Sequence, residues 1–199
     1  MKILSDDLER SHIFMIMSRP VSIWQYLLGK YIGLGIILLI TTIILGTSAA
    51  LSVQYVLIKY PAFVPQNFSW LTFFMAMCCQ FFSLLMVLAL SFVCFSFASQ
   101  PFIALLLAIS SYLVGQNMEL LRRVVTENPY TLQIDGQKQL VLILSWIFPN
   151  LSFFDKKYIA AYGVPFSGQE FLFLCLYAIS YSMLLIYFAS LLFKRKELA

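Results

Sequence analysis

Few side chains in this sequence could perform chemistry on a substrate. His12 is the only histidine, so neither a Ser/His/Asp triad nor a two-histidine metal site can be assembled. Gly29-Lys30 lacks the upstream glycine and the following hydroxyl of a phosphate-binding loop. We therefore predict no catalytic residue, no metal site and no cofactor on this chain, and we interpret His12 as a solvated side chain or a protein contact.

The cysteines are predicted to have a packing role. They are Cys78, Cys79, Cys94 and Cys175, and all four lie in apolar stretches without the paired spacing of metal ligands. A thiol in such surroundings behaves as a small hydrophobic side chain.

One small cluster of charges follows an apolar stretch. Glu119 precedes Arg122 and Arg123 by one helical turn, a spacing that brings side chains to one face of a helix. Such a cluster could line the outer mouth of a transport path. The interpretation we favour is that the three residues anchor a helix at the membrane interface and pair with one another.

The composition excludes a water-soluble domain. Hydrophobic residues make up 61% of the 199 residues and charged residues only 11%, and a soluble domain of this size could not bury so much apolar surface. The net charge is +4, but the basic residues are spread along the chain without the long basic run that tracks phosphates. We therefore predict a membrane protein without a nucleic-acid partner.

Four apolar stretches are long enough to cross a bilayer and contain no Asp, Glu, Lys, Arg or His. The predicted transmembrane spans are 31–58, 70–98, 102–118 and 171–193. The expected fold class is thus all-α, a polytopic helical membrane protein. Proton relays and ion-coupled pumps usually need ionisable residues inside the spans, so a proton-driven transporter is disfavoured.

Four spans place both chain ends on the same side of the membrane. Lys194, Arg195 and Lys196 follow the last span directly, and basic residues next to span ends favour the cytoplasm. We predict cytoplasmic termini and an extracytoplasmic region at 119–170. Within that region, Leu140 to Phe148 is apolar but too short to cross a bilayer. It forms either a short interfacial helix or a segment packed on the other helices.

The N-terminal residues 1–30 form the predicted cytoplasmic segment. Acidic residues at positions 6, 7 and 9 precede an apolar stretch at 13–17, which is typical of a short amphipathic helix. Ser18 could cap a second helix with Pro20 in its first turn. Such a segment could present one face to a partner protein. The alternative is a plain amphipathic helix on the membrane surface.

Five runs of residues, spread over nearly the whole chain, form a recognisable pattern. They are Asp7-Leu8-Glu9 with Ile13, Ser18 to Ser22, Tyr26 to Gly33, Pro149 to Asp155, and Phe193 to Leu198. These runs resemble the ABC-2 family of ABC transporter permeases, especially the group of the nitrous-oxide-reductase maturation permease. Family members usually have six spans and this chain begins where their second has ended, so we expect the first two to be absent. Ile23 also departs from the family, because many relatives have a basic residue there.

The resemblance implies a permease subunit of an ATP-driven transporter, an exporter by family association, in a bacterial inner membrane. ATP would bind to a separate cytoplasmic ABC ATPase subunit. The chain would act as a homodimer or pair with another permease chain. The alternative function is a non-transporting membrane scaffold or assembly protein, or a truncated permease remnant.

The resemblance also gives roles to individual residues. The ATPase-coupling residues would be Glu9, Ile13, Phe14, Ile16, Ser18, Arg19 and Pro20. The charged members would set the docking orientation and the apolar members would fill a groove. Gly29 and Gly33 would let helices approach closely, and Lys30 would anchor the inner interface.

Overall fold

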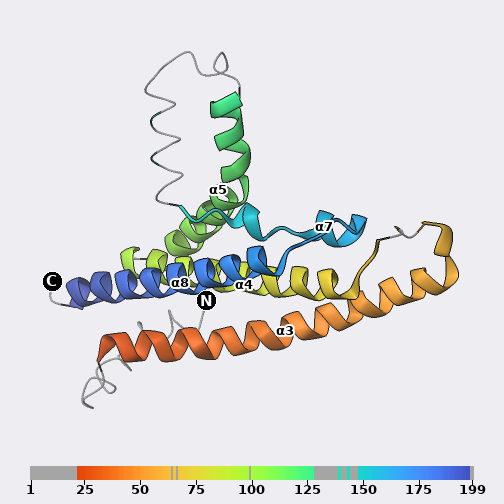
Figure 1. The fold of residues 1–199 in the computed structure, drawn as a ribbon. Helices are drawn as coiled ribbons and strands as arrows, with labels where there is room; N and C mark the ends of the chain where they lie inside the picture. The colour runs from red at the N-terminus through yellow and green to blue at the C-terminus, as the bar shows by residue number, and fades with distance from the viewer. Residues whose placement is uncertain are drawn as a thin grey trace.

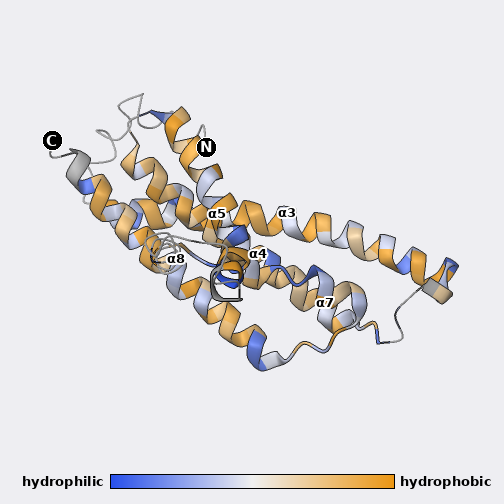
Figure 2. Cartoon of the chain, turned by 90° about the horizontal axis from the view of Figure 1, so that it is seen from above, coloured by the Kyte–Doolittle hydropathy of each residue, from blue (hydrophilic) through white to orange (hydrophobic). Residues whose placement is uncertain are grey.

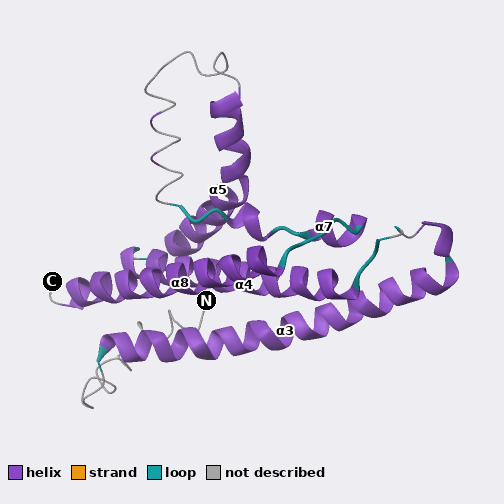
Figure 3. Cartoon of the chain, in the orientation of Figure 1, coloured by secondary structure: helices purple, strands orange, loops and turns teal. Residues whose placement is uncertain are grey.

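The described part of the chain consists of helices and the segments that flank them (Figures 1 and 3). The computed structural model describes residues 22–63, 65, 67–98, 100–127, 139, 143 and 148–197. The elements are α3 (Ile23–Lys59), η1 (Pro61–Phe63), α4 (Trp70–Phe97), α5 (Pro101–Glu127), η2 (Leu151–Phe154), α7 (Lys157–Tyr162) and α8 (Gly168–Glu197). The described residues contain no strand, and the predicted all-α fold is confirmed.

Four of the described helices, α3, α4, α5 and α8, are long and apolar enough to cross a membrane. Their outward surfaces are largely hydrophobic (Figure 2), as expected when the surrounding solvent is lipid. The chain is therefore a helical membrane protein, and its four long helices correspond to the four predicted spans.

The core forms where α4 contacts both α8 and α3. Ala89 of α4 and Ala189 of α8 are fully buried in one cluster with Phe92 and Ile186. Small side chains let helix backbones approach closely, and membrane helices associate mainly through such packing. Leu27 of α3 is buried in the same cluster, so the start of α3 is held against the other two helices.

The start of α3 differs from the predicted organisation. Ser22 is its N-cap, and the Ser22 hydroxyl and the Gln25 side chain each bond the other residue's backbone N–H, at 3.4 and 3.1 Å. Such a capping box satisfies two amides that would otherwise lack partners. The helix therefore begins well before the predicted span at 31–58, and residues 23–30 form its first turns. The proposed cap at Ser18 lies outside the described residues.

The third span also differs, because α5 continues to Glu127 beyond the predicted end at residue 118. No glycine or proline lies between Gly115 and Pro129, so nothing in the sequence breaks the helix there. The last part of α5 rises away from the other helices (Figure 1). The predicted loop at 119–170 thus begins with helix, and it also contains η2 and α7. Leu140 to Phe148 lies almost wholly outside the described residues.

Gly163 fixes the connection between α7 and α8. It caps α7 in the left-handed conformation with φ of 66°, and a Cβ there would lie 2.6 Å from the backbone oxygen of Asn67. Any other residue would strain the backbone and collide with the chain that precedes α4.

We expect Gly163→Ala to lower the free energy of unfolding by about 2 kcal/mol, because it adds both backbone strain and a clash with backbone atoms. The measurement is the midpoint of thermal unfolding in detergent, followed by helical circular dichroism. Gly168→Ala is the matched control, since no atom lies within 4 Å of its Cβ position. Equal midpoints for the two variants would contradict this explanation.

Candidate functional site

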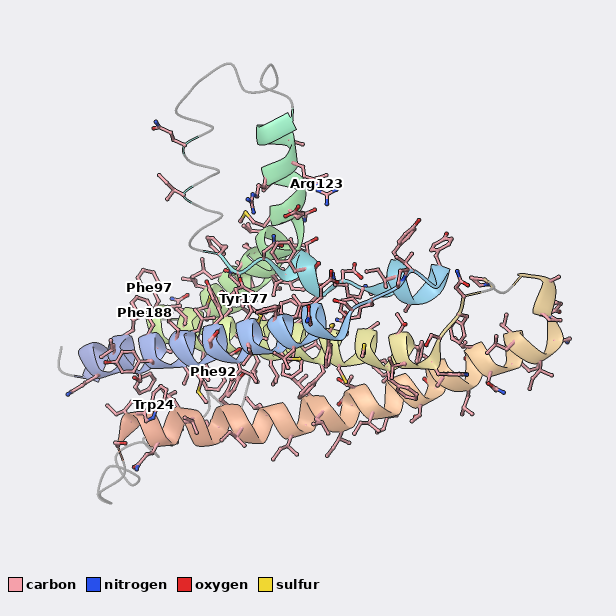
Figure 4. All side chains as sticks on the ribbon, viewed as in Figure 1. Trp24, Phe92, Phe97, Arg123, Tyr177 and Phe188 are labelled. Carbon is pink, nitrogen blue, oxygen red and sulfur yellow. The ribbon has the colours of Figure 1, made fainter. Side chains whose placement is uncertain are left out.

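A cavity of about 550 Å³ lies between the C-terminal part of α5, the segment 148–156 and the first half of α8. Its lining residues are Met118, Arg122, Phe148, Asn150, Phe153, Lys156, Glu170, Phe173, Leu174, Tyr177 and Tyr181. Figure 4 shows Tyr177 on α8 beneath the crossing of α5, with Arg123 on the rising part of α5. Five of the lining side chains are aromatic and three are charged.

The segment 149–154 is held in place by close contacts with α5 and by its own apolar side chains. A Cβ at Gly115 would lie 3.0 Å from the carbonyl oxygen of Pro149 and 2.9 Å from Cδ1 of Leu151. Only glycine therefore permits this approach. Leu151 and Phe154 are buried in a cluster with Met86 of α4, so the segment is fixed from both sides.

A polar network joins α5, this segment and α8 next to the cavity. The Nε of Arg123 donates to Oε1 of Glu119 at 3.1 Å, and Nδ2 of Asn150 donates to Oε2 of Glu119 at 3.2 Å. The backbone N–H of Asn150 donates to the Tyr177 hydroxyl at 3.3 Å. Hydrogen bonds to a carboxylate are stronger than neutral ones, so Glu119 ties α5 to the buried Asn150.

One atom of this network has no partner. Asn150 is only 8% exposed, and no donor among the described residues reaches its buried Oδ1. A buried acceptor without a donor is costly, and Asn150 itself lines the cavity.

The charged lining groups come from three different elements. Arg122 is on α5, Lys156 precedes α7, and Glu170 is in the first turn of α8. The Lys156 Nζ lies 5.3 Å from the centre of the Phe166 ring, a cation–π distance. The cavity therefore combines two positive charges and one negative charge with an aromatic wall.

The structure brings the predicted outer-mouth residues together. Glu119 and Arg123 form the expected pair across one helical turn, and Arg122 lines the cavity. Sequence reasoning missed Asn150, Lys156, Glu170 and the tyrosines of α8. In the sequence, Pro149-Asn150 ends an apolar run and Glu170 precedes a predicted span. Neither pattern indicates which helices these residues contact in the folded chain.

Among the described residues, the predicted packing glycines have no neighbouring helix at their Cβ positions. Gly29 and Gly33 are exposed, and no atom lies within 4 Å of their Cβ positions. Close approaches occur instead at Gly35, 3.2 Å from Leu85, and at Gly46, which faces Met77. Gly35 and Gly46 share a helix face, whereas Gly33 lies about 200° around the helix from Gly35.

The remaining predicted residues divide into two groups. Lys30 lies on the first turns of α3 with its Nζ 5.0 Å from the centre of the Tyr26 ring. All seven predicted coupling residues, from Glu9 to Pro20, lie outside the described residues.

Within the described part of the chain, no group of three or more metal-ligating His, Cys, Asp or Glu residues is present, and Cys79 and Cys94 are buried thiols.

No protein-family model, curated protein or solved structure matches this chain.

We expect Glu119→Gln to lower the free energy of unfolding by about 1 to 2 kcal/mol, because a neutral amide cannot accept from both Arg123 and Asn150 as the carboxylate does. The change in the free energy of unfolding is measured by thermal unfolding in detergent. Asp155→Asn is the control: its pair with Lys157 is exposed and 3.7 Å long, so its loss should cost less than about 0.5 kcal/mol. A Glu119 variant as stable as the control would show that the network contributes nothing.

Proposed function

We propose that this chain is the membrane subunit of an ATP-driven transporter of the ABC-2 type, acting as an exporter. A separate cytoplasmic ATPase would hydrolyse ATP and dock on the N-terminal segment. The observation that carries the proposal is the form of α3: a continuous helix of 37 residues that starts from a capping box and buries only three of its residues. The helix follows directly after the segment that resembles a coupling connection.

The first turns of α3 are attached to the bundle at several points. Trp24 contacts Tyr187 of α8, with ring centres 5.9 Å apart, and the Tyr31 hydroxyl donates to the carbonyl oxygen of Leu85 at 3.2 Å. Leu27 is fully buried between them. A force applied just before Ser22 would therefore act on α3, α4 and α8 together.

The rest of α3 has few contacts with the other described elements. Beyond Gly46 none of its residues is buried, and its C-terminal end extends past the other helices (Figure 1). Large apolar side chains such as Leu51 and Ile58 are 73% exposed. This face supports pairing with a second permease chain, and the open space at Gly29 and Gly33 would allow a partner helix to come close.

In this proposal the coupling segment uses two kinds of contact. Glu9 and Arg19 orient the ATPase through charge pairs, and the apolar side chains Ile13, Phe14 and Ile16 fill its groove. Lys30 stays at the membrane interface, where a long basic side chain can reach the head groups.

The coupling role is tested by purifying the tagged chain from its native membrane in mild detergent and identifying co-purifying proteins by mass spectrometry. We expect recovery of an ATPase with nucleotide-binding motifs, and its loss when residues 6–20 are deleted. The deletion stops before Ser22 so that the capping box and the Trp24 contact remain. The double variant Glu9→Arg with Arg19→Glu should lower ATPase recovery about tenfold, because the charge pairs become repulsive.

Lys59→Glu at the opposite end of α3 is the control for a charge reversal and should leave recovery unchanged. If no ATPase is recovered with the unaltered chain, the transporter proposal fails and a scaffold that contacts its partners through the spans is favoured.

Pairing through α3 is tested by cysteine cross-linking in native membranes. We expect Gly33→Cys to give a cross-linked dimer, because this position faces away from the chain's own helices. Gly35→Cys is the control, since Gly35 is covered by Leu85. The unaltered chain is a second control, because it measures any cross-linking by the exposed Cys78. Equal cross-linking at both positions would contradict pairing on this face.

A further inference from the structure

The C-terminal end of α3 carries a lysine in contact with two tyrosine rings. The Nζ of Lys59 donates to the Tyr55 hydroxyl at 2.8 Å and lies 5.3 and 5.8 Å from the ring centres of Tyr55 and Tyr60. All three residues are exposed. Each of these side chains has an apolar body and a polar tip, which is the type of side chain that collects where a membrane meets water.

The start of α4 lies close to the same level. Trp70 is its first residue, and its ring contacts three neighbouring phenylalanine rings with centres 5.4 to 6.3 Å away. Gly46 of α3 faces Met77, and α3 and α4 run in opposite directions (Figure 1). Trp70 precedes Met77 by seven residues, so it lies level with Val53, which is about 9 Å before Lys59 along α3.

α7 adds two exposed aromatic side chains at this end of the bundle. It contacts α4, and the close approach of Gly163 to Asn67 holds it next to the chain that precedes α4. Tyr158 and Tyr162 are 66% and 62% exposed, with ring centres 4.4 Å apart, and the side chain of Lys157 beside them is 78% exposed. Three elements that are separated in the sequence therefore present aromatic rings together with exposed lysines.

The opposite end of α3 repeats this combination. The Nζ of Lys30 lies 5.0 Å from the ring centre of Tyr26, and no charged residue lies between Lys30 and Lys59. The two lysines are about 44 Å apart along the helix, and a tilt of about 20° would reduce this to about 41 Å. A bilayer with its head groups is about 40–45 Å thick. The spacing of the two lysine–tyrosine contacts thus matches the two surfaces of a membrane.

A different position of α3 would expose its last turns to water. The hydrocarbon core alone is about 30 Å thick, so a helix of this length could also project beyond the head groups. Val56 and Ile58 are 43% and 73% exposed, and an apolar side chain of this size loses about 1.5–3 kcal/mol when it stays in water. Contact with lipid is therefore favoured for the end of α3.

We propose that this end of the molecule binds the phospholipid surface of the leaflet at the α7 end. Lys59, held by Tyr55 and Tyr60, contacts the phosphates of the head groups. Trp70 and the α7 tyrosines lie about one head-group layer deeper, at the boundary of the hydrocarbon. The partner of this surface is phospholipid and not a second protein, and the inference does not depend on coupling to an ATPase.

The test is the depth of single tryptophans in the full chain, reconstituted into liposomes of phosphatidylcholine and phosphatidylglycerol. Depth is measured from quenching by phosphatidylcholine that is brominated either near the head group or near the chain ends. Each chain keeps one tryptophan and has Phe at the other tryptophan positions. We expect Trp70 and Tyr158→Trp to lie about 15 Å from the bilayer centre and Tyr60→Trp about 20 Å from it, so bromines near the head group quench all three more strongly.

Leu45→Trp is the matched control, because Leu45 is 63% exposed and lies midway between the two lysines of α3. It should lie within about 5 Å of the bilayer centre, with the order of quenching reversed. Quenching of Tyr60→Trp and Tyr158→Trp by aqueous acrylamide but by neither brominated lipid would overturn the proposal and place this end in water. If those variants fail to fold, Trp70 decides, since quenching mainly by bromines near the chain ends would also overturn it.

The contact of Lys59 with phosphate is tested separately. Lys59→Met in the Tyr60→Trp chain should move the tryptophan toward the bilayer centre, because an apolar side chain no longer reaches for the head groups. Lys157→Met in the same chain is the control for loss of a charge and should leave this depth unchanged. An unchanged depth in the Lys59 variant would show that Lys59 does not hold the end of α3 at the surface.

Discussion

The packing of α4 against α8 is the interaction on which the rest of the structure depends. Lipid tails are as apolar as the helices, so burial of apolar surface does not by itself drive membrane helices together. Close van der Waals packing must supply the attraction, and it requires small side chains. Ala89 on α4, with Ala178 and Ala189 on α8, meets that requirement, since all three are buried almost completely. The elements α3, α5, η2 and α7 all contact this pair. Leu27 brings α3 to one part of it, and Leu151 and Phe154 bring the segment before α7 to another.

The same packing determines where the cavity forms. The segment 149–154 lies between α5, which it approaches at Gly115, and the surface of α4 and α8. The Phe154 ring stacks on Tyr177 with centres 6.2 Å apart, and the same Tyr177 hydroxyl accepts from the Asn150 backbone. Asn150 is therefore largely buried beside Glu119, with 8% of its surface exposed. A polar group in that position is stable only when its atoms find partners, and Glu119 and Tyr177 supply them for the amide nitrogen and the backbone N–H of Asn150.

The four membrane helices could be predicted from the sequence because each is a long apolar run, and hydrocarbon thickness sets the length of such runs. The residues at which these helices begin and end were harder to predict from the sequence. The start of α3 depends on the Ser22 capping box, which competes in the sequence with an equally plausible cap at Ser18. The extension of α5 depends on residues 119–127 staying helical although four of these nine residues are charged. The cavity could be predicted only in part: the pair of Glu119 and Arg123 follows from helical spacing, but the contact of Glu119 with Asn150 joins positions far apart in the chain, and local pattern carries no signal for it.

α8 is the element that connects the cavity with the start of α3. Its first turns contribute Glu170 and Tyr177 to the cavity, and Tyr187, about 15 Å further along the helix, contacts Trp24 at the start of α3. Because α8 is helical throughout, a displacement at one end is transmitted to the other. A partner protein that moved α3 would thereby change the shape of the cavity. The reverse would also hold, since any ligand that binds one arrangement of α8 more tightly must favour that arrangement at α3 by the same free energy. Under the proposed function, binding in the cavity and docking at the N-terminal segment would then be linked through α8.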